Sequence, residues 1–198
     1  SRDLNEIILE GLEARRTSAG ADAMKTYLEQ QARLSVPLSS VRNDLRNANG
    51  IAMESVAIQV EPGLSVSGTL YTPAGEAARP GVLLVGSDED LATKMATAGA
   101  VVLALRPRGT GSPDPSNRGL LGDWIGNTRA WLVGRNLPVM RAVDIRKGVD
   151  FLSAMSGVRD VRAAARGVDG VWLLIAATLD NRIGRLWLDR TPPNLISA

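Results

Sequence analysis

The sequence predicts an α/β fold built on a mostly parallel sheet, and three observations point to it. Val82–Val85 and Val101–Leu105 are apolar runs of strand length, as expected for strands buried on both faces. A segment with helical periodicity separates them, which is the alternation that builds parallel sheets. Residues 161–179 then repeat the order of strand, glycine-containing turn and apolar helix. A chain of 198 residues, 44% of them hydrophobic, can form one substantial core and an appended element.

The first 48 residues are expected to form a helical extension ahead of a core over residues 49–198. Apolar residues share one helical face before and after a break at Ser18–Gly20, in the sets Leu4, Ile7, Ile8, Leu12 and Met24, Tyr27, Leu28, Leu34. Val36–Ser40 ends this pattern. Such a stripe indicates a helical pair packed on the core or on a second subunit, and the alternative is a lid or a partner-binding arm.

Residues 51–72 change to a period of two, which predicts a β-hairpin. Apolar residues alternate with polar or small ones on either side of a turn at Pro62–Gly63, in the sets Val56, Ile58, Val60 and Leu64, Val66, Gly68, Leu70.

The first of the parallel strands is Val82–Val85. Ser87 follows with a hydroxyl suited to an N-cap, and the acids after it suit the first turn of a helix over Leu91–Ala98. The next buried strand, Val101–Leu105, ends in a long turn over residues 106–113. Open α/β sheets hold their sites at this end of the strands.

The later part of the chain continues the alternation. Residues 114–137 are expected to be irregular, and residues 142–152 carry a helical stripe. A strand from Val161 leads into the turn Gly167–Gly170 and its apolar helix, and Gly184–Leu188 forms the last strand.

Composition excludes several classes of function. The net charge of +2 is too balanced to favour nucleic acid or an acidic membrane surface, and no apolar run reaches the roughly 20 residues that span a bilayer. The chain has no cysteine and no histidine, so thiol catalysis, a Ser-His-Asp triad and a histidine-rich zinc site are excluded within it. Gly109 and Gly111 do not form a dinucleotide fingerprint, because the third glycine is missing and no helix opens there. We expect no cofactor and no metal, and the cellular compartment stays open.

The order of elements resembles the α/β-hydrolase superfamily, most closely its bacterial carboxylesterases of the acetyl xylan esterase and dienelactone hydrolase type. The matching pieces span roughly residues 51–190 and are Gly68–Pro73, Pro80–Gly86, Arg108–Ser112, Gly167–Gly170 and Ala176–Ile183. The resemblance implies an α/β-hydrolase-like sheet with an N-terminal β-hairpin and a helical N-terminal extension. It also implies a sheet that is incomplete at its C-terminal side, with Gly184–Leu188 as the edge strand.

The resemblance places a degenerate nucleophile elbow at the turn before the apolar helix. Asp169 stands in the nucleophile position, and the oxyanion-hole donors would be backbone groups of Gly86, Ser87 and Gly170. An aspartate can act as a nucleophile, but the resulting ester would turn over poorly without a histidine. The alternative is that the Asp169 carboxylate caps the following helix.

Arg106 and Arg108 lie near this turn and are candidates for binding a carboxylate or a phosphate. The alternative is that they neutralise Asp169 or hold their own loop in place.

The sequence therefore predicts an esterase-related protein without hydrolytic activity of its own, which acts as a binding or structural module for a small ester or carboxylate. The alternative is the N-terminal part of an acetyl xylan esterase-like carboxylesterase. A homo-oligomer that pairs through the Gly184–Leu188 edge is a further expectation.

Overall fold

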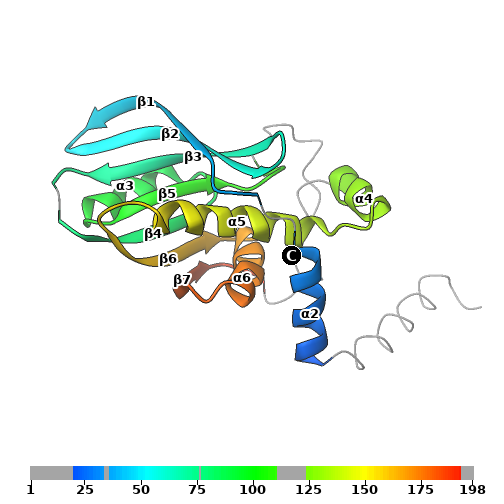
Figure 1. Cartoon of the computed structure of the whole chain (residues 1–198). Helices are drawn as coiled ribbons and strands as arrows, with labels where there is room; N and C mark the ends of the chain where they lie inside the picture. The colour runs from blue at the N-terminus through cyan, green and yellow to red at the C-terminus, as the bar shows by residue number, and fades with distance from the viewer. Residues whose placement is uncertain (1–19, 34–35, 76, 111–123, 193–198) are drawn as a thin grey trace, which may run out of the picture.

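The computed structural model describes residues 20–33, 36–75, 77–110 and 124–192. In this part of the chain one sheet contains seven strands in the order β1-β2-β3-β5-β4-β6-β7 (Figure 1). The strands are β1 Ser40–Ala48, β2 Ile51–Glu61, β3 Leu64–Pro73, β4 Arg79–Val85, β5 Val101–Arg106, β6 Val158–Arg166 and β7 Ile183–Asp189.

The sheet is mostly parallel, as predicted. Strands β5, β4, β6 and β7 pair in parallel. Strand β3 is antiparallel to β5 and to β2, so β2 runs with the parallel set, and only β1 and β3 of the described strands oppose it. The predicted hairpin is β2 and β3, and its turn lies at Pro62–Gly63.

Strand β1 corrects the expected secondary structure of the N-terminal extension. Residues 40–48 were assigned to the helical extension, beyond the end of its helical pattern, and they form an edge strand antiparallel to β2. All nine residues of β1 are exposed, so no apolar alternation marks them as a strand. Asp44 has a φ of 55° at the point where the register shifts, so β1 carries an irregularity that interrupts its edge.

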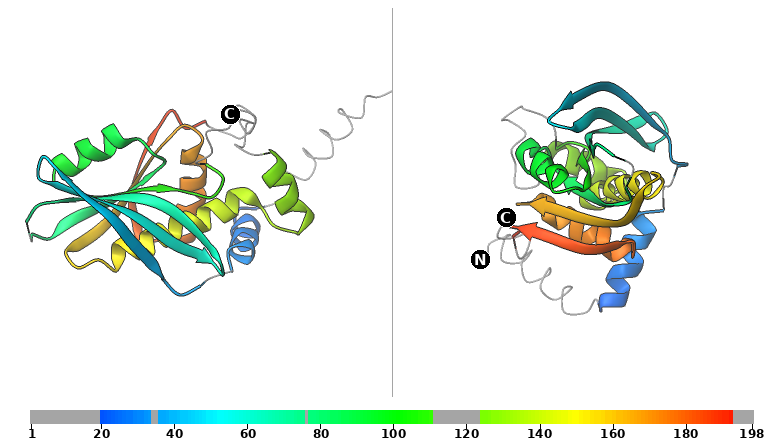
Figure 2. Two further views of the ribbon diagram at one scale, coloured as in Figure 1. Left: turned by 90° about the horizontal axis from the view of Figure 1, so that it is seen from above. Right: turned by 90° about the vertical axis from the view of Figure 1, so that its left-hand side faces the viewer.

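Helices cover both faces of the sheet. Helix α3 (Glu89–Thr97) packs on one face, and α5 (Leu137–Ser153) with α6 (Asp169–Leu179) packs on the other (Figure 2). The larger core lies under α5 and α6, and its fully buried side chains include Leu83, Leu103, Ile145, Leu152 and Trp172. Gly148 of α5 faces β4 and β5 so closely that a Cβ there would lie 2.8 Å from Leu83, which lets the helix approach the sheet.

Two further helices lie at one end of the molecule. Helix α2 (Ala21–Gln31) confirms the helix expected around Met24 and docks on α5 and α6 (Figure 1). The first apolar set of the extension lies outside the described residues. Helix α4 (Trp124–Leu132) corrects the expectation that residues 114–137 are irregular. None of the described helices is long and apolar enough to cross a membrane.

Candidate functional site

The turn between β6 and α6 is the tightest part of the predicted site. Strand β6 ends at Arg166, and α6 begins at Asp169, so two residues reverse the chain. Gly167 has a φ of 62°, while the next residue, Val168, already has helical angles. A strand therefore passes abruptly into a helix at the carboxyl end of the parallel strands, and the left-handed residue that makes this possible is Gly167.

Asp169 lies two residues beyond that point and is the first residue of α6. Its Oδ2 lies near Gly86, since a Cβ added to Gly86 would come within 3.2 Å of it. The residue at the N-cap is Val168, with no side-chain capping bond, so Asp169 is not the cap that the sequence suggested. Burial raises the pKa of Asp169 to about 6, and the positive charge of Arg141 opposes that rise.

Arg141 of α5 is the main neighbour of this carboxylate that the sequence did not reveal. Its side chain is buried, and its Nε donates a hydrogen bond of 3.0 Å to the backbone oxygen of Arg108. Its guanidinium lies 5.3 Å from the ring centre of Trp172 in α6. Arg141 therefore joins the loop after β5 to the helix that follows the turn.

Two of the three predicted oxyanion-hole donors are engaged in the fold. The N–H of Gly86 donates to Leu105 at 2.8 Å, and the N–H of Gly170 donates to the oxygen of Gly167 at 3.1 Å. Within the described residues, the N–H groups of Ser87 and Val168 make no hydrogen bond. The unengaged N–H groups are therefore those of Ser87, one of the expected donors, and of Val168, which was not expected.

Gly170 has a packing role instead. A Cβ at this position would collide with Thr191, which lies two residues beyond the end of β7. Glycine at residue 170 lets the chain leave β7 directly against the first turn of α6.

Arg108 is occupied by structural ion pairs and is not available to bind a ligand. Its Nε donates to both carboxylate oxygens of Asp144, and its Nη1 donates to Glu61 at 2.6 Å. Arg135 pairs with the same Glu61 at 2.9 Å. These contacts agree, for Arg108, with the alternative considered from the sequence, that the arginines hold their own loop in place. Arg106 is exposed at the end of β5, and no hydrogen bond or ion pair joins its side chain to another described residue.

Arg166 connects three chain segments at this edge of the sheet. It donates from Nη1 to Asp88 at 2.6 Å and from Nε to Asp189 at 2.7 Å. Asp88, and not Ser87, caps α3 by accepting a hydrogen bond from the N–H of Leu91. The loop after β4, the turn after β6 and the end of β7 are therefore linked through one side chain.

Gly167, the left-handed residue of this turn, has no side chain, and the N–H groups of Ser87 and Val168 are not engaged in the fold. An unengaged N–H group can donate to a carbonyl oxygen, and a carboxyl with a pKa of about 6 can exchange a proton with a ligand. A Cβ at Gly167 would have open space around it, but glycine places no reactive atom there. Among the described residues, no group of three or more acidic side chains is arranged to hold a metal ion.

Known proteins match this chain in fold and not in sequence. No protein-family model matches the chain, and no curated protein is similar in sequence. The solved structures that share its fold include a putative acetyl xylan esterase from Bacteroides fragilis (TM-score 0.71, 12% identity, 83% of this chain and 51% of that one). They also include the acetyl xylan esterase 1 of Thermoanaerobacterium, with a TM-score of 0.66 and 15% identity over 81% of this chain and 56% of that one. The acetyl xylan esterase of Paenibacillus has a TM-score of 0.66 and 20% identity over 85% of this chain and 59% of that one.

This chain thus spans between 51% and 59% of the length of those three structures. At such low identity the likeness establishes the architecture alone. The chain has the open, mixed α/β fold of the acetyl xylan esterases.

Proposed function

We propose that this chain is an esterase-related binding module, which holds a small ester or carboxylate at the β6–α6 turn without hydrolysing it. The observation that carries the proposal is Gly167, the residue with the left-handed backbone between strand and helix. In a nucleophile elbow the reactive side chain projects from that strained point.

The geometry favours a register two residues earlier than the one expected from the glycines. With Gly167 at the centre, the small residue two positions before it is Ala165, which is fully buried. The residue two positions after it is Asp169, whose side chain fits because Gly86 has none. The N–H of the following residue, Val168, is then the oxyanion-type donor.

Asp169 is a poor candidate for the nucleophile in this register. Its carboxylate lies beside Gly86, and the chain has no histidine to activate water against an ester intermediate. General-base assistance of that kind is worth about 10²–10⁴-fold in rate. Above pH 6 the ionised carboxylate also repels an anion, so an uncharged ester is the better ligand there.

An aryl ester assay tests the inactive state. With 4-nitrophenyl acetate, the wild type should show neither a burst nor turnover above buffer. Turnover that Asp169→Asn abolishes would contradict the proposal, because it would make Asp169 a working nucleophile.

Binding is tested with acetanilide, an amide analogue of an aryl ester that does not hydrolyse readily. Val168→Pro removes the donor N–H, and the φ of −63° at this residue suits proline. Val168→Ala loses similar packing but keeps the N–H, so it is the matched control. Ligand-observed NMR should show saturation transfer with Val168→Ala and its loss with Val168→Pro. Equal signals from both variants would argue against this binding site.

Cysteine labelling tests which residue occupies the sharpest point. Because the chain has no cysteine, each introduced thiol is the only one. A thiol in Gly167→Cys lies at the N-terminus of α6, where its pKa should fall, and Ser153→Cys lies at the C-terminal end of α5 as an exposed control. Iodoacetamide should label Gly167→Cys several-fold faster at neutral pH. Faster labelling of Asp169→Cys than of Gly167→Cys would restore Asp169 to the elbow position.

A second candidate function is the N-terminal part of a carboxylesterase, as the sequence suggested. The chain spans about half to three fifths of the length of the solved esterases, and Leu186 and Trp187 of the edge strand β7 are 39% and 44% exposed. A further strand, from a longer protein or from a second copy, would pair with that edge. The intact mass of the source protein separates a fragment from a complete chain.

Sedimentation tests the oligomer. A dimer that Leu186→Lys with Trp187→Lys converts to a monomer would support pairing through β7, while a monomeric wild type at micromolar concentration would reject it.

A further inference from the structure

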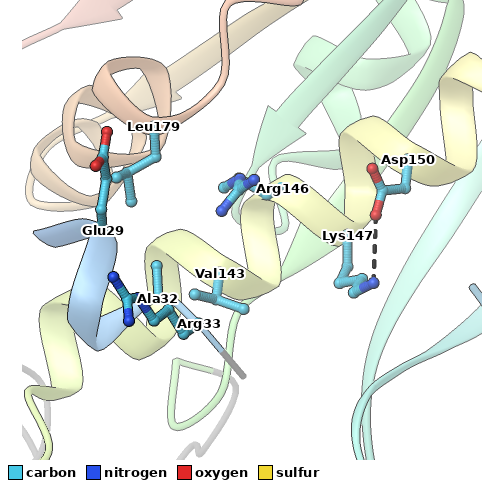
Figure 3. A pocket seen from close by; sticks show the side chains of 8 residues that line it. All are labelled: Glu29, Ala32, Arg33, Val143, Arg146, Lys147, Asp150 and Leu179. Carbon is cyan, nitrogen blue, oxygen red and sulfur yellow. Dashed lines mark ion pairs between the residues drawn. The ribbon is translucent and has the colours of Figure 1, made fainter. Parts of the chain in front are cut away.

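A second candidate site lies between α2, α5 and α6, away from the β6–α6 turn. It is a cavity of about 300 Å³, bordered by charged side chains and by the apolar residues Ala32, Val143 and Leu179 (Figure 3). Leu179 ends α6 and Asp169 begins it, so the length of an 11-residue helix, about 15 Å, separates the two sites.

The helical repeat explains why these side chains meet. Val143, Arg146, Lys147 and Asp150 follow one another at steps of three, one and three residues, which places them on one face of α5. Helix α2 docks beside that face, because Leu28 and Ala32 pack on Val139, Val143 and Leu179. The cavity exists only because α2 is docked.

Lys147 is already neutralised within the fold. Its Nζ donates to the backbone oxygen of Val36 at 2.6 Å and pairs with Asp150 at 3.3 Å, the contact marked in Figure 3. Asp150 also accepts a hydrogen bond of 2.6 Å from Arg182. This part of the wall has no charge left for a ligand.

Unlike Lys147, the arginines Arg146 and Arg33 are not neutralised by short contacts within the fold. The Nε of Arg146 lies 3.7 Å from Asp180, too far for a hydrogen bond, and Asp180 already accepts several bonds from Arg182. That Nε is buried and has no hydrogen-bond partner within the described residues. Arg33 at the end of α2 has no ion pair in the same part of the chain. The cavity therefore presents two guanidinium groups whose donors are largely unused.

We propose that this cavity binds a small monocarboxylate with an apolar body. A guanidinium matches a carboxylate with two parallel hydrogen bonds, which suits Arg146 with support from Arg33. The apolar wall of Ala32, Val143 and Leu179 covers the body of the molecule. At about 30 Å³ for each water-sized group, the volume accommodates about ten non-hydrogen atoms, the size of benzoate.

Removal of the Glu29 charge should change the ligand affinity in the opposite direction to removal of the Arg146 charge. It lines the same cavity from α2, and among the described residues it forms no ion pair with Arg33 or Arg146. Its carboxylate would repel the ligand, so Glu29→Gln should tighten binding while Arg146→Gln weakens it.

The experiment is a titration of the full chain with benzoate, followed by NMR or calorimetry. We expect a Kd of about 1 mM for the wild type and at least about a tenfold increase for Arg146→Gln. Arg146→Lys should retain part of the affinity, because lysine keeps the positive charge but cannot form the two parallel hydrogen bonds of a guanidinium. Lys94→Gln is the control, because it removes one positive charge on α3, across the sheet.

Three results would overturn the proposal: no binding of benzoate at about 10 mM, equal binding by wild type and Arg146→Gln, or inorganic phosphate binding as tightly as benzoate. The last would show that the apolar wall contributes nothing. If Arg146→Gln fails to fold, Arg33→Gln serves in its place, because Arg33 is exposed and its loss leaves no buried partner.

Discussion

Two clusters of acids and arginines lie at the carboxyl edge of the sheet and differ in how their charges are satisfied. In the Arg108 cluster, formed by Arg108, Asp144, Glu61 and Arg135, each acid accepts short hydrogen bonds from an arginine. In the turn cluster, Asp169 is partly buried beside Gly86 and is attracted by Arg141.

The pKa values of Glu61 and Asp169 differ in this way, although burial raises the pKa of the paired Asp144 as well. The hydrogen bonds from Arg135 and Arg108 lower the pKa of Glu61 to about 2, while burial raises that of Asp169 to about 6. Paired acids fix a loop in place, whereas a buried acid without such bonds keeps a proton that a ligand can influence.

The largest expected effect comes from breaking the Arg108 cluster. Arg108→Ala leaves the fully buried carboxylate of Asp144 without its partner, which should cost about 3–5 kcal/mol of unfolding free energy. Urea denaturation measures it. Arg106→Ala is the matched control, two residues away and exposed, and should change stability by less than about 0.5 kcal/mol. Similar losses from both variants would remove the distinction between the clusters.

The next largest effect is a pH-dependent change in stability on substitution of Asp169 in the turn cluster. Because folding raises the pKa of Asp169 from 3.8 to about 6, wild-type stability falls as pH rises through that window. Asp169→Asn does not titrate, so its stability relative to wild type should rise by up to about 3 kcal/mol between about pH 4 and pH 7. Denaturation curves at several pH values check this. A constant difference between the two proteins would mean that Asp169 is not buried as described.

A smaller effect on stability, with the opposite pH dependence, is expected for Glu61. Its contribution is present above the unfolded pKa of about 4.5 and is lost as pH falls toward 2. Glu61→Gln should therefore be less stable than wild type by about 2 kcal/mol at neutral pH, and the gap should close in acid. Acid titration followed by circular dichroism measures the gap. If it widens in acid, the pairing with Arg135 is not what stabilises Glu61.

The sheet and its hairpin were predictable because burial leaves a pattern in the sequence. Strands β4 and β5 are apolar on both faces, and β2 alternates buried with more exposed residues. Strand β1 is exposed throughout and leaves no such pattern. Helix α4 was missed because its sequence mixes Gly126 and Asn127, poor helix formers, with large apolar residues, and Trp131 remains 75% exposed.

The turn was predictable as an architecture but not in its register. Gly167 and Gly170 are three residues apart, and either could flank a reactive centre in the sequence. The difference lies in backbone angles and packing, since Gly167 is left-handed and Gly170 makes room for Thr191. Arg141 and Asp144 look like ordinary polar helix positions, because the groups that bury them come from distant loops: Arg108 and Asp144 are 36 residues apart.

The ion pairs of Arg166 should depend on ionic strength. Its side chain is 44% exposed, so solvent ions reach both of its contacts, to Asp88 and to Asp189. At high ionic strength the Debye length shrinks to about 3 Å, and such contacts weaken while enclosed pairs hardly change. Concentrated salt should thus loosen the three segments around the turn together and leave the sheet intact, so that the amide hydrogens of these segments exchange faster with solvent.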